Sequence, residues 1–135
     1  QAALLKSYFQ KYAPDKLAYS CVYPSYGVYN WGSSDYNWQD SSYTRYIDGY
    51  LSTIRPDVLA LNYYPFAASG DNASLIRNDL WRDMGYVRKR AAESGIPYWH
   101  YFQGVGNFED KSIGAMTVEK IMVQMYAGLL MEPRG

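Results

Sequence analysis

The sequence predicts an α/β fold in which helices alternate with parallel strands. Two observations carry this prediction. Three short, near-continuous apolar runs indicate strands buried on both faces, at residues 17–23, 58–63 and 96–102. Segments with apolar residues at helical spacing lie before, between and after these runs. Strands that alternate with helices in this way favour a parallel sheet.

The elements follow from local signals taken in chain order. A helix is predicted over residues 2–12, because apolar residues recur at helical spacing until Pro14. The first strand follows it and ends at Pro24. The next helix, residues 43–54, is predicted because Ile47, Leu51 and Ile54 share one face.

The second half of the chain repeats the pattern. After the second strand, the longest helical segment is predicted over residues 75–94, with Leu80, Met84 and Val87 on one face and Gly95 as its stop. The third strand follows, and Thr117 is positioned to cap a final apolar helix. The connections from helix to strand are short, whereas the loops after the strands are long and rich in Tyr, Trp, Asn and Asp. In α/β folds the carboxyl ends of the strands form the functional face, so we expect function there.

Composition limits the function classes. Thirteen basic residues balance thirteen acidic ones, which gives no electrostatic reason to expect nucleic acid or an anionic membrane as partner. No stretch is apolar for long enough to span a bilayer, and no signal peptide is recognised. With one Cys and one His, neither a zinc site nor an internal disulfide is expected, and no cofactor is predicted. The 16 tyrosines suit either a sugar-binding cleft or the filling of core and surface.

Three segments resemble a known family in the family's order. LAYSCVYPSYG (residues 17–27) resembles a strand end of the type NLLPSYG, RPDVLALNYYP (residues 55–65) resembles KPDYISYDHYP, and SGIPYWHYFQ (residues 94–103) is similar to AGIPFWYFIQ. These motifs occur in bacterial glycoside-hydrolase-like barrels of the beta-galactosidase and endoglycosidase clan. The resemblance implies that the whole chain, residues 1–135, is one partial domain, half of a (β/α)8 (TIM) barrel with strands five to seven.

The same resemblance defines the expected chemistry and its gaps. The family uses a carboxylate after strand four as general acid, which would precede residue 1 and is absent here. Gln103 stands where the clan usually has a nucleophilic Glu near the end of strand seven. The implied function is a glycoside-hydrolase-like protein that acts on or binds carbohydrate, with the catalytic pair in question. The parent family is often secreted or periplasmic, and the sequence itself leaves localisation open.

Candidate site residues come from the loops after the strands. Retaining hydrolysis needs two carboxyl groups about 5 Å apart. Glu109 and Asp110 are the predicted catalytic carboxylates, with a solvated loop as the alternative. Gln103 is predicted either to bind a sugar hydroxyl or to be a structural amide. The other predicted substrate contacts, with core and loop packing as the alternative, are Asn62, Tyr63, Tyr64, Tyr26, Trp31, Trp38 and Trp99. His100, the single histidine, is predicted to occupy a core position, with a general base as the alternative.

A three-stranded parallel sheet has two unpaired edges, which a protein must cover. We therefore expect a homodimer or a domain-swapped oligomer. The alternative to an enzyme is a non-enzymatic carbohydrate-binding or structural half-barrel that self-associates.

Overall fold

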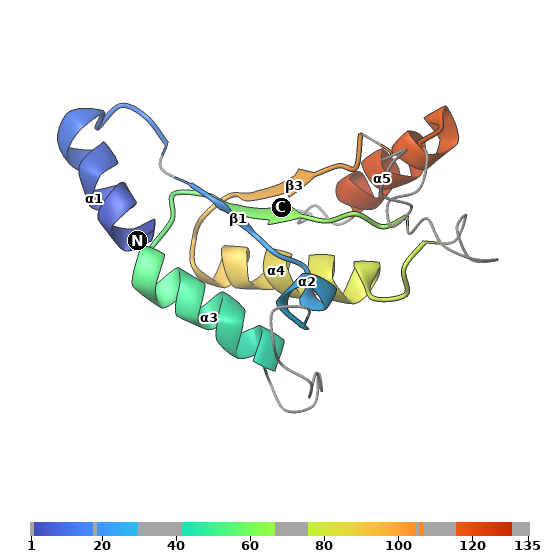
Figure 1. Cartoon of the computed structure of the whole chain (residues 1–135), viewed down its shortest axis with the longest axis horizontal. Coiled ribbons are helices and arrows are strands. Elements are labelled where there is room, and N and C mark those ends of the chain that lie inside the picture. The colour runs from blue at the N-terminus through green and yellow to red at the C-terminus, as the bar shows by residue number, and fades with distance from the viewer. Residues whose placement is uncertain are drawn as a thin grey trace.

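The computed structural model of the chain describes residues 2–17, 19–29, 42–66, 76–104, 106 and 116–130. Each strand is preceded and followed by a helix along these residues (Figure 1), which confirms the predicted α/β class. In chain order the elements are α1 (Ala2–Tyr12), β1 (Cys21–Val22), α2 (Ser25–Tyr29), α3 (Ser42–Ile54), β2 (Leu59–Asn62), α4 (Leu80–Glu93), β3 (Tyr98–Tyr101) and α5 (Val118–Leu130).

The three strands form one small parallel sheet in the order β1-β2-β3. The central strand is β2, whose Ala60 lies opposite Cys21 of β1 and Trp99 of β3. Leu61 in the same way lies between Val22 and His100. Because successive side chains of a strand point to opposite faces, this register sorts the strand residues into two faces.

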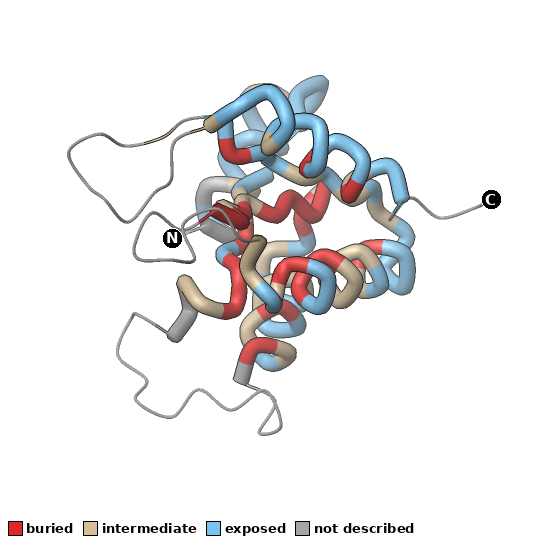
Figure 2. Tube along the Cα trace, turned by 90° about the vertical axis from the view of Figure 1, so that its right-hand side faces the viewer, coloured by how far each residue is buried: buried red, intermediate tan, exposed pale blue. Residues whose placement is uncertain are grey.

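The first face of the sheet carries the hydrophobic core. Leu59 and Leu61 of β2 are fully buried there, in one cluster with Ile47 of α3 and with Met84 and Val87 of α4. Helices α3 and α4 lie side by side against this face (Figure 1), and buried residues in Figure 2 concentrate where they meet the sheet. Full burial of a Leu or Val side chain stabilises a fold by about 1.5–3 kcal/mol, so this layer holds the described part of the chain together.

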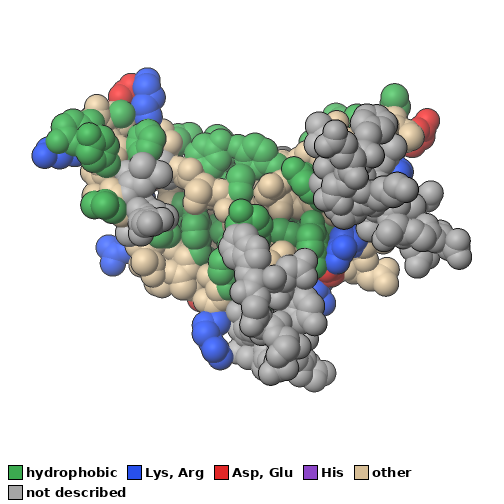
Figure 3. Space-filling model, in the orientation of Figure 1, with side chains coloured by type: hydrophobic (Ala, Val, Ile, Leu, Met, Phe, Trp, Pro, Cys, Tyr) green, Lys and Arg blue, Asp and Glu red, His purple; other side chains and the backbone are tan. Residues whose placement is uncertain are grey.

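The second face of the sheet is much less covered. Helices α1 and α5 lie toward opposite ends of the molecule in Figure 1, and the view in Figure 3 shows hydrophobic side chains across the middle between them. Trp99 is 40% exposed and Tyr101 is 38% exposed, whereas their neighbours Tyr98 and His100 are partly buried against the core face. The sheet is therefore covered by helices mainly on one side.

The structure departs most from the prediction at three places. The predicted strand over residues 17–23 pairs only at Cys21–Val22. Residues 25–29 form the short helix α2, because the buried carboxylate of Asp83 accepts a hydrogen bond from the Ser25 N–H at 2.7 Å. The predicted helix over residues 75–94 begins only at Leu80, because Ile76 pairs with Phe66 in an antiparallel bridge.

Other predicted boundaries are confirmed. Gly95 follows α4 with a φ of 67°, the left-handed conformation that glycine adopts without steric cost. Arg55 ends α3 in a similar conformation, with a φ of 51°. The hydroxyl of Thr117 accepts a long hydrogen bond, 3.4 Å, from the N–H of Lys120 at the start of α5.

Candidate functional site

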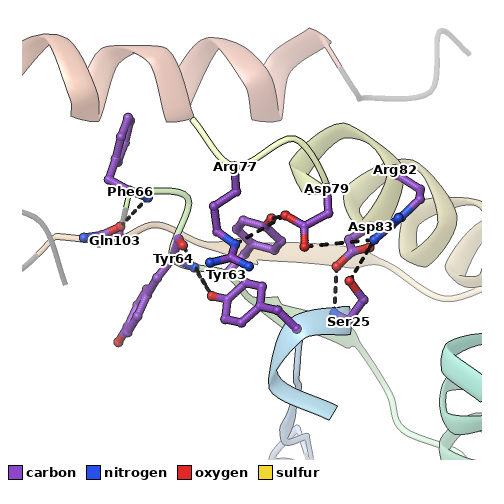
Figure 4. Close-up of polar contacts among 10 residues, drawn as sticks. Ser25, Tyr63, Tyr64, Phe66, Arg77, Asp79, Arg82, Asp83 and Gln103 are labelled. Atoms are coloured by element: carbon purple, nitrogen blue, oxygen red, sulfur yellow. Dashed lines mark hydrogen bonds and ion pairs between the residues drawn. The ribbon is translucent and has the colours of Figure 1, made fainter. Parts of the chain in front are cut away.

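The carboxyl ends of the strands carry a dense polar network (Figure 4). Its members come from the segment after β1, the segment after β2 and the first turn of α4. Tyr26 links the first two of these segments, since its hydroxyl donates to the Tyr64 carbonyl at 3.3 Å and accepts from the Tyr64 N–H at 3.1 Å. Burial raises the pKa of Tyr26, so its hydroxyl stays protonated and can donate.

The aromatic faces of this network are already occupied. The guanidinium of Arg77 lies over the Tyr26 ring, 3.8 Å from its centre, in a cation–π contact. The rings of Tyr26 and Tyr63 meet edge to face, with their centres 5.3 Å apart. Tyr63 itself is fully buried and offers no free face for the stacking of a pyranose, whereas Tyr26 is half-buried with Arg77 over one of its faces.

Two aspartates at the start of α4 anchor the network, and sequence reasoning did not single them out. The Tyr63 hydroxyl and the Arg77 Nε, at 3.3 Å, both donate to Oδ1 of Asp79. Burial and the hydrogen bond to Asp79 raise the pKa of Tyr63. The spacing of Asp79 and Asp83, one helical turn apart among arginines, is the signal that could have found the pair.

Asp83 is the more deeply buried of the two. One oxygen accepts from the Ser25 N–H at 2.7 Å, and the other accepts from Arg82 at 3.3 Å. Arg82 also donates to the Ser25 hydroxyl at 2.9 Å. Burial raises the pKa of Asp83, with the Ser25 hydrogen bonds as an opposing effect. Both carboxylate oxygens of this fully buried side chain are engaged, so its role is to hold α2 against α4.

Gln103 is fully buried and hydrogen bonded within the chain. Its Oε1 accepts from the Phe66 N–H at 3.1 Å. Its main-chain N–H donates to Oε1 of Gln124 at 2.8 Å, and its carbonyl accepts from Nε2 of Gln124 at 3.1 Å. This geometry matches the structural-amide alternative, because Gln103 ties the ends of β2 and β3 to α5 and exposes no surface to a ligand.

The exposed aromatic residues gather elsewhere, on the less covered face of the sheet. Tyr19, Trp99 and Tyr101 form an aromatic cluster, in which Tyr19 meets Trp99 edge to face at 5.2 Å and lies nearly parallel to Tyr101 at 6.5 Å. The hydroxyls of Tyr19 and Tyr101 are hydrogen bonded to each other, which raises the pKa of Tyr101 to about 12. Asn62, half-buried, lies opposite Tyr101 in the strand register.

Sequence reasoning named Trp99 and Asn62 but missed Tyr19 and Tyr101. Their signal is the strand alternation, which places Trp99 and Tyr101 on the same face two residues apart. Cys21 lies on this face too, and burial raises the pKa of its thiol, so it is a protonated, half-buried side chain rather than a nucleophile.

Four predicted site residues lie outside the described residues: Glu109, Asp110, Trp31 and Trp38. In the part of the chain that the structure describes, no group of three or more His, Cys, Asp or Glu residues is arranged to hold a metal ion. Nor is any helix in this part long and apolar enough to cross a membrane. Comparison of the chain with protein-family models, with curated proteins and with solved structures finds no match.

Proposed function

We propose that the chain is a carbohydrate-binding half-barrel of the glycoside-hydrolase-like type, and that the aromatic cluster of Tyr19, Trp99 and Tyr101 is its saccharide platform. The observation that carries the proposal is the exposure of this cluster. Tyr19 and Trp99 are each 40% exposed, and Tyr101 is 38% exposed. The rings offer apolar faces, while the phenol hydroxyls offer hydrogen bonds, and sugars present the same combination.

The arrangement of the sheet supports the half-barrel part of the proposal. The strands follow one another in chain order, and the two crossover helices, α3 and α4, lie on the same face. Right-handed crossovers between strands added successively in one direction produce this arrangement. A (β/α)8 barrel continues the same pattern until the sheet closes, and its inner face then corresponds to the face that carries the aromatic cluster.

Binding is better supported than turnover. Asp79 and Asp83 are the acidic pair of the strand-end network, and Asp83 is fully buried with both oxygens engaged. Glu109 and Asp110 remain the predicted catalytic carboxylates. We therefore propose saccharide binding as the function, and a separate assay of p-nitrophenyl glycosides tests hydrolysis by Glu109 and Asp110.

The test is a calorimetric titration with galactotetraose, cellotetraose and mannotetraose. We expect binding of at least one oligosaccharide, weakened about tenfold or more in Trp99→Ala, because an aromatic stacking contact contributes about 0.5–1.5 kcal/mol beyond the burial of its apolar area. Trp81→Ala is the matched control, since Trp81 is similarly exposed, at 43%, but lies on α4. Equal losses in the two variants, or binding of none of the sugars, would contradict the proposal.

The same samples decide between an enzyme and a binding module. Release of p-nitrophenol from p-nitrophenyl glycosides that is lost in Glu109→Gln would establish the hydrolytic activity. Saccharide binding without release of p-nitrophenol would identify a non-enzymatic module.

Self-association is the second candidate, and exposed apolar surface favours it. Helix α5 leaves Val118 68%, Leu129 62% and Leu130 76% exposed, although apolar residues dominate its sequence. In addition, β3 pairs on one side only within the described residues. A homodimer would bury both features. Light scattering after size-exclusion chromatography should give twice the chain mass of 15.5 kDa, and a monomer at all concentrations would exclude this candidate.

A further inference from the structure

A large hollow lies between α4, β3 and α5, away from the strand-end network. Its volume is about 950 Å³, enough for a small organic molecule. Most of its lining is apolar and includes Ile96 and Pro97 before β3, Phe102 after it, and Met125 and Leu129 of α5. The hollow thus has walls from three elements, and Trp99 is the residue of the aromatic cluster that lines it.

Two buried nitrogen atoms in the lining residues lack hydrogen-bond partners. They are Nε of Arg88 on α4 and Nε2 of His100 on β3, and both side chains line the hollow. Among the described residues, no other buried side-chain nitrogen or oxygen atom is without a partner. An unsatisfied buried polar group costs about 1–3 kcal/mol, so two such atoms at one hollow call for a common explanation.

Nε of Arg88 is a donor, and Nε2 of His100 is a donor in one of the two neutral tautomers of the imidazole. The Nε of a guanidinium always carries a proton. Burial lowers the pKa of His100 to about 4, so its imidazole is neutral near pH 7. Burial also raises the pKa of Tyr98, which therefore keeps its proton. The Tyr98 hydroxyl lies 3.2 Å from Nδ1 of His100, and in the tautomer in which Nδ1 accepts from this hydroxyl the imidazole proton is on Nε2.

The charge at the hollow is complementary to an anion. Its charged lining residues are Arg88, Lys89 and Glu93. Glu93 forms ion pairs with Lys89, at 3.8 Å, and with Arg90. Within the part of the chain that the structure describes, the positive charge of Arg88 is thus balanced by no ion pair.

We infer that this hollow binds a small molecule with a carboxylate group and an apolar acyl or aryl body. The carboxylate accepts hydrogen bonds from Nε of Arg88 and Nε2 of His100, while the body lies against Phe102, Met125 and Leu129. The pairing is favoured because charge-assisted hydrogen bonds are about twice as strong as neutral ones. Of the three residues of the proposed saccharide platform, Trp99 also lines this hollow, but neither proposal requires the other.

The test compares octanoate with octanol, which has the same chain length without the charge. Calorimetric titration of the full chain should show octanoate binding about tenfold or more tightly than octanol. His100 is the single histidine, so its imidazole nitrogen signals are assigned without ambiguity by NMR. Octanoate should shift the Nε2 signal, and octanol should shift it far less.

Variants locate the carboxylate. Arg88→Met keeps most of the side-chain length but removes the donors, and should weaken octanoate binding about tenfold or more without changing octanol binding. Arg45→Met is the matched control. Arg45 is an exposed arginine on α3, outside the lining of the hollow, so this substitution removes the same charge without touching the proposed site. Circular dichroism verifies that each variant is folded.

Three results would overturn the inference. The first is equal affinity for octanoate and octanol, which needs no variant. The second is an equal loss of octanoate binding in Arg88→Met and Arg45→Met. The third is a His100 Nε2 signal that moves on dilution of the protein alone, because a second copy of the chain would then occupy the hollow.

Discussion

The buried imidazole of His100 should make the stability of the fold depend on pH. Burial lowers its pKa from 6.5 to about 4. Between these two values the unfolded chain binds a proton that the folded chain does not, so the free energy of unfolding falls as the pH falls. Each pH unit of this interval contributes about 1.4 kcal/mol. Because His100 is only partly buried, we expect a total loss of about 2–3 kcal/mol between about pH 7 and pH 4.

Asp83 acts in the opposite direction and must be separated from His100. Burial raises the pKa of Asp83 above its ordinary value of 3.8. Between 3.8 and the raised pKa the folded chain holds a proton that the unfolded chain does not, so stability rises as the pH falls through this interval. The variant His100→Phe keeps a ring of similar size and leaves Asp83 unchanged. The difference in free energy of unfolding between wild type and His100→Phe therefore isolates the imidazole.

Urea unfolding at a series of pH values measures that difference. The free energy of unfolding of His100→Phe should rise by about 2–3 kcal/mol relative to that of wild type as the pH falls from about 7 to 4. The reason is that proton binding to the imidazole of the unfolded chain destabilises the wild-type fold only. NMR of the single histidine should give a titration midpoint near 4 in the folded chain. Parallel stability curves for the two proteins, or a midpoint near 6.5, would refute the reasoning.

Three further substitutions have defined outcomes in urea unfolding. Gly95→Ala should destabilise the fold by about 1–2 kcal/mol, because a φ of 67° is strained for alanine. No atom lies within 4 Å of the new Cβ, so the strain comes from the backbone alone. The control Gly49→Ala, on α3, should not destabilise the fold. Tyr63→Phe should cost about 1–2 kcal/mol through loss of the hydrogen bond to Asp79, against less than about 0.5 kcal/mol for the exposed Tyr8→Phe. Gln124→Leu removes the partner of both the N–H and the carbonyl of Gln103, and should cost about 2–4 kcal/mol, whereas the exposed Gln10→Leu should be near neutral. A substitution that costs no more than its control would contradict the role given to that residue.

The sequence was sufficient to predict the elements that depend on local patterns. The apolar spacing of Leu80, Met84 and Val87 places their side chains in the core, and all three are buried. Gly95 ends α4 because its conformation is a local property of the chain. The parallel order of the strands follows from their alternation with helices.

The strand-end network was not predictable in the same way, because its contacts join residues far apart in sequence. Helix α2 depends on Asp83, which lies 58 positions after Ser25. For the same reason Tyr26, Tyr63 and Gln103 were predicted as substrate contacts, although their polar groups bond within the chain. A Tyr or Gln in a loop sequence shows that a hydrogen bond is needed, but not which atom provides it.

The aromatic cluster was missed for a different reason. Alternation shows that Trp99 and Tyr101 share a face, but not whether helices cover that face. That information came only from the placement of α3 and α4. Likewise, the apolar composition of α5 predicts a helix but not the exposure of Leu129 and Leu130.

The central position of β2 determines the order in which the sheet can open. Its neighbours β1 and β3 each pair with it, and Val58, Leu59, Ala60 and Leu61 are at most 1% exposed. Local fluctuations can therefore release β1 or β3 singly, whereas β2 is freed only when both ladders and the core beneath it break. Backbone amides of β2 should accordingly exchange with solvent at the rate of global unfolding, and those of β1 and β3 by smaller openings.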